Sequence, residues 1–89
     1  MFSVRQDEKA IEYTQDGQML GEITWYLQGD TMVMDHTYVS TTLRGQGIAK
    51  QLLDEAANYA RANHYKMQPL CSYVVTAFKR YDDYEDVKK

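Results

Sequence analysis

The chain has 89 residues and a mass of 10.4 kDa. This length accommodates one small domain, because folded domains commonly need about 100–200 residues each. Hydrophobic residues make up 44% of the chain and charged residues 26%, a composition typical of globular proteins rather than disordered ones. We therefore expect a single domain over residues 1–89.

The sequence shows no targeting segment, disulfide or metal motif. No apolar stretch approaches the ~20 residues that span a bilayer, and the first eight residues lack the apolar part of a signal peptide, so we expect a cytoplasmic protein without a membrane partner. The single cysteine, Cys71, has no intrachain disulfide partner. The other soft ligands are His36 and His64, and their spacing matches no zinc pattern, so no metal is expected.

The net charge of −3 argues against nucleic acid as the main partner, because phosphate backbones attract a basic surface. The charge is nonetheless uneven along the chain. Residues 1–35 hold two basic and seven acidic side chains, whereas residues 44–80 hold six basic and two acidic ones. This division predicts one site for a phosphate-bearing ligand and another for a cationic one.

The first half of the chain predicts a β-meander. Turn signals at residues 16–17 and 29–30 separate segments rich in β-prone residues. Strands are expected at about 10–14, 19–27 and 31–39. In the third strand, alternation places Met32, Met34, His36 and Tyr38 on one face and Val33, Asp35, Thr37 and Val39 on the other.

A helical pattern follows the polar, glycine-bearing segment 40–47. Apolar residues recur on one stripe from Ala49 to Ala60, which predicts an amphipathic helix. A short strand at 66–70 and a second helix from Ser72, a good N-cap, to about Tyr81 complete the chain. The order β-β-β-α-β-α predicts an α+β domain with a mainly antiparallel sheet and two helices.

The segment Arg44-Gly45-Gln46-Gly47-Ile48-Ala49 lies between a predicted strand and a predicted helix. Its two glycines allow a tight turn, and the helix N-terminus adds free N–H donors and the positive end of the helix dipole. Such a loop binds an anion, and pyrophosphate is the natural ligand. The alternative is a glycine-containing helix entry without a ligand.

The same segment resembles the acetyl-CoA loop of the GNAT N-acetyltransferases, which has Gln or Arg, two residues, Gly, one residue, and Gly or Ala. Arg44, Gly47 and Ala49 occupy these positions. The similarity extends over about residues 37–81, and the sequence resembles the short, single-domain members of the family. It implies a minimal GNAT-like fold, acetyl-CoA as cosubstrate, loop amides on the pyrophosphate and a pantetheine arm along the strand that ends at Val39. The residues that it implies for binding the acyl donor are Tyr38, Val39, Arg44, Gly45, Gln46, Gly47, Ile48, Ala49 and Lys50. Lys50, Lys79 and Arg80 are also candidates for binding the ribose phosphate, but the motif does not specify these three residues.

Three side chains are candidates for the chemistry, which needs a base for the amine, donors for the thioester oxygen and an acid for the leaving thiolate. Cys71 precedes a predicted helix N-terminus, where thiolate is favoured, and is a candidate nucleophile or acid. The alternative is that Cys71 is a small buried hydrophobic residue. His36 is a candidate base or activator of Cys71, or a half-buried structural histidine. Tyr81 lies four residues after Ala77, as the general acid does in larger relatives, or else closes the helix onto the sheet.

The expected function is acetyl-CoA-dependent N-acetyl transfer to a small-molecule or peptide amine, with a homodimer as a possible assembly. The alternative is a non-catalytic acyl-CoA-binding sensor or partner module. Convergence of Cys71 and His36 would favour a covalent acetyl-enzyme, and their separation would favour direct transfer. The chain has no room for the N-terminal helices that enclose the acceptor in many GNAT domains, which predicts an open acceptor site, or one completed by another subunit.

Overall fold

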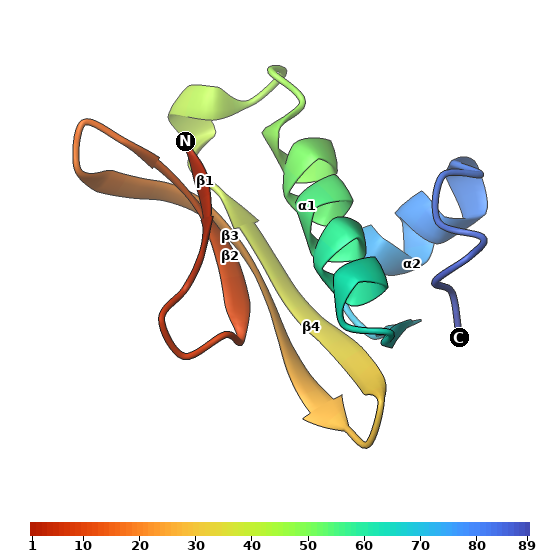
Figure 1. Ribbon diagram of the computed structural model, residues 1–89. Coiled ribbons are helices and arrows are strands. Elements are labelled where there is room, and N and C mark those ends of the chain that lie inside the picture. Colours follow the sequence, from red (N-terminus) through yellow and green to blue (C-terminus); the bar gives the residue numbers. More distant parts are fainter.

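The computed structural model describes residues 1–89 and consists of a five-stranded sheet with two helices on one of its faces (Figure 1). The strands are β1 (Phe2–Val4), β2 (Ala10–Gln15), β3 (Gln18–Gln28), β4 (Thr31–Val39) and β5 (Lys66–Pro69), and the helices are α1 (Ile48–Ala62) and α2 (Ser72–Arg80), with a 3-10 turn at Thr41–Leu43. The strands stand in chain order; β1 to β4 are antiparallel, and β5 joins β4 in parallel. The predicted α+β class is confirmed.

The first strand, β1, was not predicted from the sequence. Its three residues pair with β2 from Phe2 opposite Tyr13 to Val4 opposite Ile11. Three residues are too few to show the alternating pattern by which a strand is predicted. The strand forms because its neighbour β2 offers a pairing edge. The other strands and both helices begin and end within two residues of their predicted bounds.

A β-bulge interrupts the pairing between β3 and β4. Thr24 pairs with His36, but the next residue, Trp25, pairs with Met34. Asp35 is therefore an extra residue in β4 with no partner in β3. Such a residue shifts the alternation of the strand by one position, so side chains before and after it exchange faces.

The bulge determines which β4 side chains face the helices. Met34 lies before the bulge and is fully buried in the core. After the bulge, Thr37 faces the same side, and its Oγ1 lies 3.4 Å from the Sγ of Cys71. His36 and Tyr38 point to the opposite, outer face of the sheet. The predicted common face of Met32, Met34, His36 and Tyr38 is therefore wrong, because Met32 and Met34 face the core and the two residues after the bulge face outward.

The core lies between the inner face of the sheet and α1, whose buried stripe ends in Ala56, Ala57 and Ala60. These small side chains let the helix backbone approach the strands. Gly21 of β3 lies where α1 comes close: a Cβ atom there would be 3.3 Å from Leu52 Cδ1. Neither helix combines the length and the apolar character needed to cross a lipid bilayer.

The C-terminal segment 81–89 packs beside both helices instead of standing free (Figure 1). Tyr84 and Val87 are buried, and the Tyr84 ring packs on Phe78 with ring centroids 5.3 Å apart. Lys88 forms a parallel bridge with Met67 of β5. Although the segment is rich in carboxylates, its two apolar anchors make it part of the core.

Candidate active site

Strand β4 loses its parallel partner halfway along its length. β5 pairs with β4 only from Thr31 to Met34, and the chain then turns away into α2. The amides of both Leu70 and Cys71 donate to the carbonyl of Met34 at this point. Residues 36–39 of β4 are therefore paired with β3 on one edge and have no strand partner on the other. An open strand edge can bind an extended ligand through main-chain hydrogen bonds.

The loop after β4 presents a set of unpaired backbone donors at the start of α1. Gly45 and Gly47 have positive φ angles of 81° and 73°, a backbone conformation that favours glycine. Gly47 is the N-cap of α1 and offers no side-chain cap. The amides of Gly45, Gly47, Ile48, Ala49 and Lys50 donate to no protein acceptor. Together with the helix dipole, they form a surface that fits a phosphate or pyrophosphate.

These donors line a groove of about 310 Å³ between the loop, the end of β4 and α2. The lining residues are Val39, Leu43, Arg44, Gly45, Gly47, Ile48, Ala49, Lys50, Tyr73 and Tyr81. Seven of the nine residues expected to bind the acyl donor are among them; the exceptions are Tyr38, whose side chain points to the outer face, and the exposed Gln46. The groove meets the open edge of β4 at Val39.

Two residues that line the groove, Leu43 and Tyr73, were not predicted from the sequence. Tyr73 and Tyr81 are eight residues apart, a spacing that places them on one side of a helix and could have indicated a shared wall. Burial raises the pKa of the Tyr73 hydroxyl, and the nearby Tyr81 adds to this effect. The hydroxyl of Tyr73 therefore remains protonated and can donate a hydrogen bond at neutral pH.

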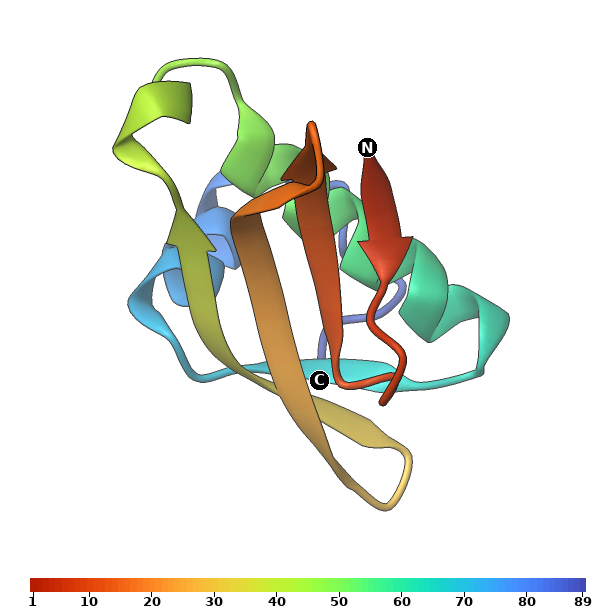
Figure 2. The same cartoon turned by 90° about the vertical axis from the view of Figure 1, so that its left-hand side faces the viewer.

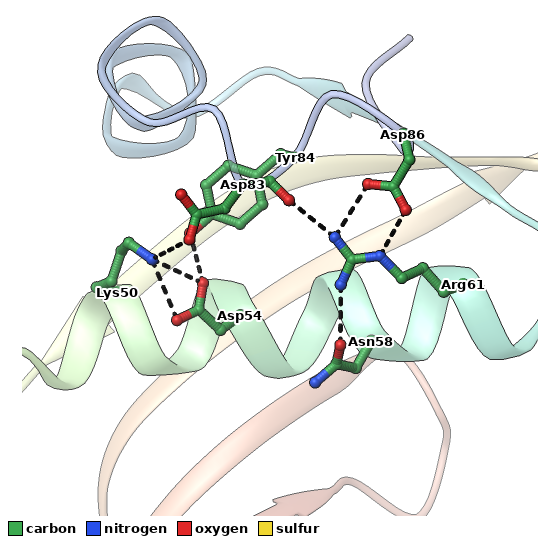
Figure 3. A network of polar contacts seen from close by, with 7 residues as sticks. All are labelled: Lys50, Asp54, Asn58, Arg61, Asp83, Tyr84 and Asp86. Carbon is green, nitrogen blue, oxygen red and sulfur yellow. Dashed lines mark hydrogen bonds and ion pairs between the residues drawn. The ribbon is translucent and has the colours of Figure 1, made fainter.

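Lys50, at the edge of the groove, is already paired with carboxylates (Figure 3). Its Nζ lies 3.0 Å from Asp54 Oδ1 and 3.2 Å from Asp83 Oδ2, and 4.8 Å from the centroid of the Tyr81 ring. The Tyr84 hydroxyl donates to Asp54 at 2.6 Å. Burial by itself lowers the pKa of Lys50, but hydrogen bonds with Asp54 and Tyr84 outweigh it and hold the pKa above its ordinary value. Lys50 is therefore charged, and its ammonium group already forms an ion pair with the C-terminal segment.

The structure separates the three candidate catalytic side chains. Cys71 is the N-cap of α2, and its thiol contacts Thr37 on the inner side of β4. His36 points to the outer side, where its Nε2 lies 3.8 Å from Glu22 Oε2. Tyr81 follows the other end of α2, whose nine residues span about 13 Å. The thiol of Cys71 and the imidazole of His36 therefore do not meet.

A larger cavity of about 480 Å³ lies at the opposite end of α1, among residues that include Arg61, His64, Lys66 and Asp86. Within it, Arg61 Nε and Asp86 Oδ2 are 2.7 Å apart and satisfy each other. The cavity contains none of the residues of the glycine loop. Unpaired donors, and not volume, therefore mark the candidate phosphate site.

Comparison with known protein families identifies the class of protein to which this chain belongs. The family model described as GCN5-related N-acetyl-transferase matches residues 8–87. The chain belongs to this family, the GNAT family, and is an acyltransferase. Members of the family use acetyl-CoA, and the resemblance seen in the sequence is confirmed.

Solved structures agree with the family assignment. A GCN5-like protein from Staphylococcus aureus is 31% identical, with a TM-score of 0.77 over 98% of this chain and 87% of its own. Ribosomal-protein-alanine N-acetyltransferase from Brucella melitensis biovar Abortus 2308 is 27% identical, with a TM-score of 0.67 over 97% of this chain and 66% of its own. N-acetylglutamate synthase from Neisseria gonorrhoeae, solved with coenzyme A and N-acetyl-glutamate, is 17% identical over 82% of this chain and 18% of its own, and its TM-score of 0.70 shows a shared fold. No curated protein matched in the corresponding comparison.

Proposed function

We propose that this protein transfers the acetyl group of acetyl-CoA to a primary amine. The observation that supports this function best is the set of five unpaired amides, at Gly45 and residues 47–50, beside the open edge of β4. Main-chain donors at a helix N-terminus suit a pyrophosphate, and an open strand edge suits the amide-bearing pantetheine arm. The groove and the strand edge thus fit two successive parts of coenzyme A in their chemical order.

This order defines which residues would hold each part of the acyl donor. The loop amides and Arg44 would bind the pyrophosphate, with Tyr81 in the adjoining wall. The arm would follow β4 from Val39 towards Asp35, and its reactive end would lie where β4 and β5 part, near Cys71. Tyr81 is then placed for binding at the phosphate end, and Cys71 is placed closer to the chemistry.

The acyl donor supplies an activated thioester, in which the C–S bond breaks as the new N–C bond to the amine forms. The chain must orient the amine, remove a proton from it and allow a proton to reach the leaving sulfur. His36 on the outer side of β4 is the candidate proton acceptor, and Cys71 on the inner side is the candidate donor to sulfur. Because these two side chains lie on opposite faces, the imidazole cannot activate the thiol, which favours direct transfer over an acetyl-cysteine.

The acceptor amine would approach from the outer face of the sheet. No helix covers this face, and Figure 2 views the strands from this side with α1 behind them. The carboxylates of Glu22 and Asp35 lie on it and attract a protonated amine. A face this open suits an amine carried by a peptide better than a small molecule that needs enclosure.

Thermal unfolding with and without acetyl-CoA tests the donor site. Gly47→Glu places a carboxylate among the unpaired amides, and we expect it to abolish the rise in Tm that acetyl-CoA gives the wild type. Gly17→Glu is the matched control, because Gly17 has a similar φ of 77° in a turn with no atom within 4 Å of an added Cβ. Undiminished protection of the Gly47 variant would contradict the site, and loss of protection in both variants would point to backbone strain.

A further inference from the structure

Glu22 of β3 lies directly opposite a second glutamate. Glu22 pairs directly with Glu12 of β2, and like charges in opposed positions on neighbouring strands repel. The Glu22 side chain is only 20% exposed, so water screens this repulsion incompletely. No core contact requires a carboxylate there, because the outer face has no helix packed on it (Figure 2). Two opposed carboxylates are a local conflict of the kind that occurs at functional sites.

The Glu22 carboxylate has a different basic side chain near each oxygen. Its Oε1 lies 3.6 Å from Arg5 Nη1, and its Oε2 lies 3.8 Å from His36 Nε2. Arg5 is mainly committed to Asp7, to which its Nε and Nη2 donate at 3.0 Å each. The guanidinium therefore restrains one oxygen of Glu22, and the other oxygen faces the imidazole.

His36 stands at the point where an acceptor and the acyl donor would meet. It follows the bulge residue Asp35, whose carboxylate accepts a hydrogen bond from Thr24 Oγ1 at 2.6 Å. The bulge is also where β5 leaves β4 and the open strand edge begins. The imidazole is 56% exposed and Glu22 is 20% exposed, so an amine arriving from the outer face meets His36 first.

We propose that Glu22 is the positioning residue for His36 in acetyl transfer, an inference that rests on the proposed function. The carboxylate lies 3.8 Å from Nε2 and attracts that side of the ring, which leaves Nδ1 as the nitrogen that accepts a proton from the incoming ammonium group. The neutral amine then forms the N–C bond as the C–S bond breaks. Of the two protons lost by the ammonium group, one passes through His36 to solvent and the other ends on the departing sulfur.

Steady-state kinetics test this inference, with acetyl-CoA as donor and either a lysine-containing peptide with a free α-amine or spermidine as acceptor. We expect Glu22→Gln to lower kcat about tenfold, part of the 10²–10⁴-fold effect that a general base provides. KM for acetyl-CoA should stay unchanged, because Glu22 does not line the donor groove. Glu12→Gln is the matched control, since it removes the opposed carboxylate without touching His36, and it should leave kcat near the wild-type value.

A double-mutant cycle separates positioning from a structural role. If Glu22 acts through His36, adding Glu22→Gln to His36→Ala should lower kcat no further. Additive losses, or equal rates for Glu22→Gln and the wild type, would overturn the inference while the acetyltransferase function stands. No turnover of either acceptor by the wild type would overturn both, and retained protection by acetyl-CoA would then indicate a binding module.

Discussion

The ammonium group of Lys50 on α1 lies 3.2 Å from the carboxylate of Asp83 in the C-terminal segment (Figure 3). Lys50 also lines the groove that carries the unpaired loop amides. The same cation is therefore available to two anions, the carboxylate of the tail and the phosphates of an acyl donor. We therefore expect binding of the donor and packing of the C-terminal segment to be coupled through this side chain.

Releasing Lys50 from the tail should strengthen donor binding. In Asp83→Asn the ammonium group loses one of its two carboxylates, and because exposed ion pairs contribute about 0–1 kcal/mol, the Kd for coenzyme A should fall by up to about fivefold. Titration calorimetry at low and high salt measures the change, which should shrink at high salt. Asp82→Asn removes the same charge from the neighbouring position, which has no ion pair, and serves as the control. A Kd that rises, or one equal in both variants, would contradict the coupling.

Cys71 should not become acetylated. Its thiol contacts Thr37, and the candidate base lies on the other face of β4, so the structure favours direct transfer. Intact-mass analysis after incubation with acetyl-CoA should show no adduct on the wild type. Cys71→Ala should keep kcat within about tenfold, because a thiolate leaves readily even without a positioned acid. An acetyl adduct that disappears in this variant would show a covalent route instead.

Gly21 should be intolerant of any side chain. A Cβ there would lie 3.3 Å from Leu52 Cδ1 and 3.3 Å from the backbone oxygen of Tyr38, and the second of these atoms cannot move without shifting β4. We expect Gly21→Ala to lower the free energy of unfolding by about 1–3 kcal/mol, as overpacking does. Denaturant titration measures the loss. Gly21→Val should cost more, and a variant as stable as the wild type would show that α1 can move away.

The pairing of Asp86 with Arg61 should make the packing of the C-terminal segment, the tail, on α1 dependent on pH. Arg61 donates to both carboxylate oxygens, at 2.7 and 3.0 Å, and this hydrogen bonding holds the pKa of Asp86 below its ordinary value of 3.8. A lowered pKa means that the stabilisation is present above about pH 4 and is lost as the pH falls through the folded-state value. Asp86→Asn should therefore lower Tm at pH 7, and its difference from the wild type should shrink in acid.

The control for this pH dependence is Glu85→Gln. Glu85 pairs only with Lys88, three residues away in the same segment, so its loss leaves the contact between tail and α1 intact. Its Tm at pH 7 should stay closer to that of the wild type. A Tm difference for Asp86→Asn that is constant from pH 7 into acid would show that the ion pair contributes nothing to tail packing.

Local patterns in the sequence were sufficient to predict most helices and strands and the glycine loop. The stripe from Ala49 to Ala60 predicts α1 because helical spacing depends on neighbours three and four residues apart. The glycines at 45 and 47 predict an anion-binding turn because the backbone conformation they permit is a local property. The sequence by itself therefore determined the fold class, the family resemblance and the position of the glycine loop.

The tertiary structure alone decided which side chains meet. Whether His36 shares a face with Met34 depends on one unpaired residue, Asp35, and that bulge arises from the pairing of β4 with β3, which no alternating pattern within β4 can reveal. The separation of His36 from Cys71, and the contact of Glu22 with His36, follow from this one-residue shift. Faces and contacts between strands depend on register, and register is set by the partner strand and the packed core.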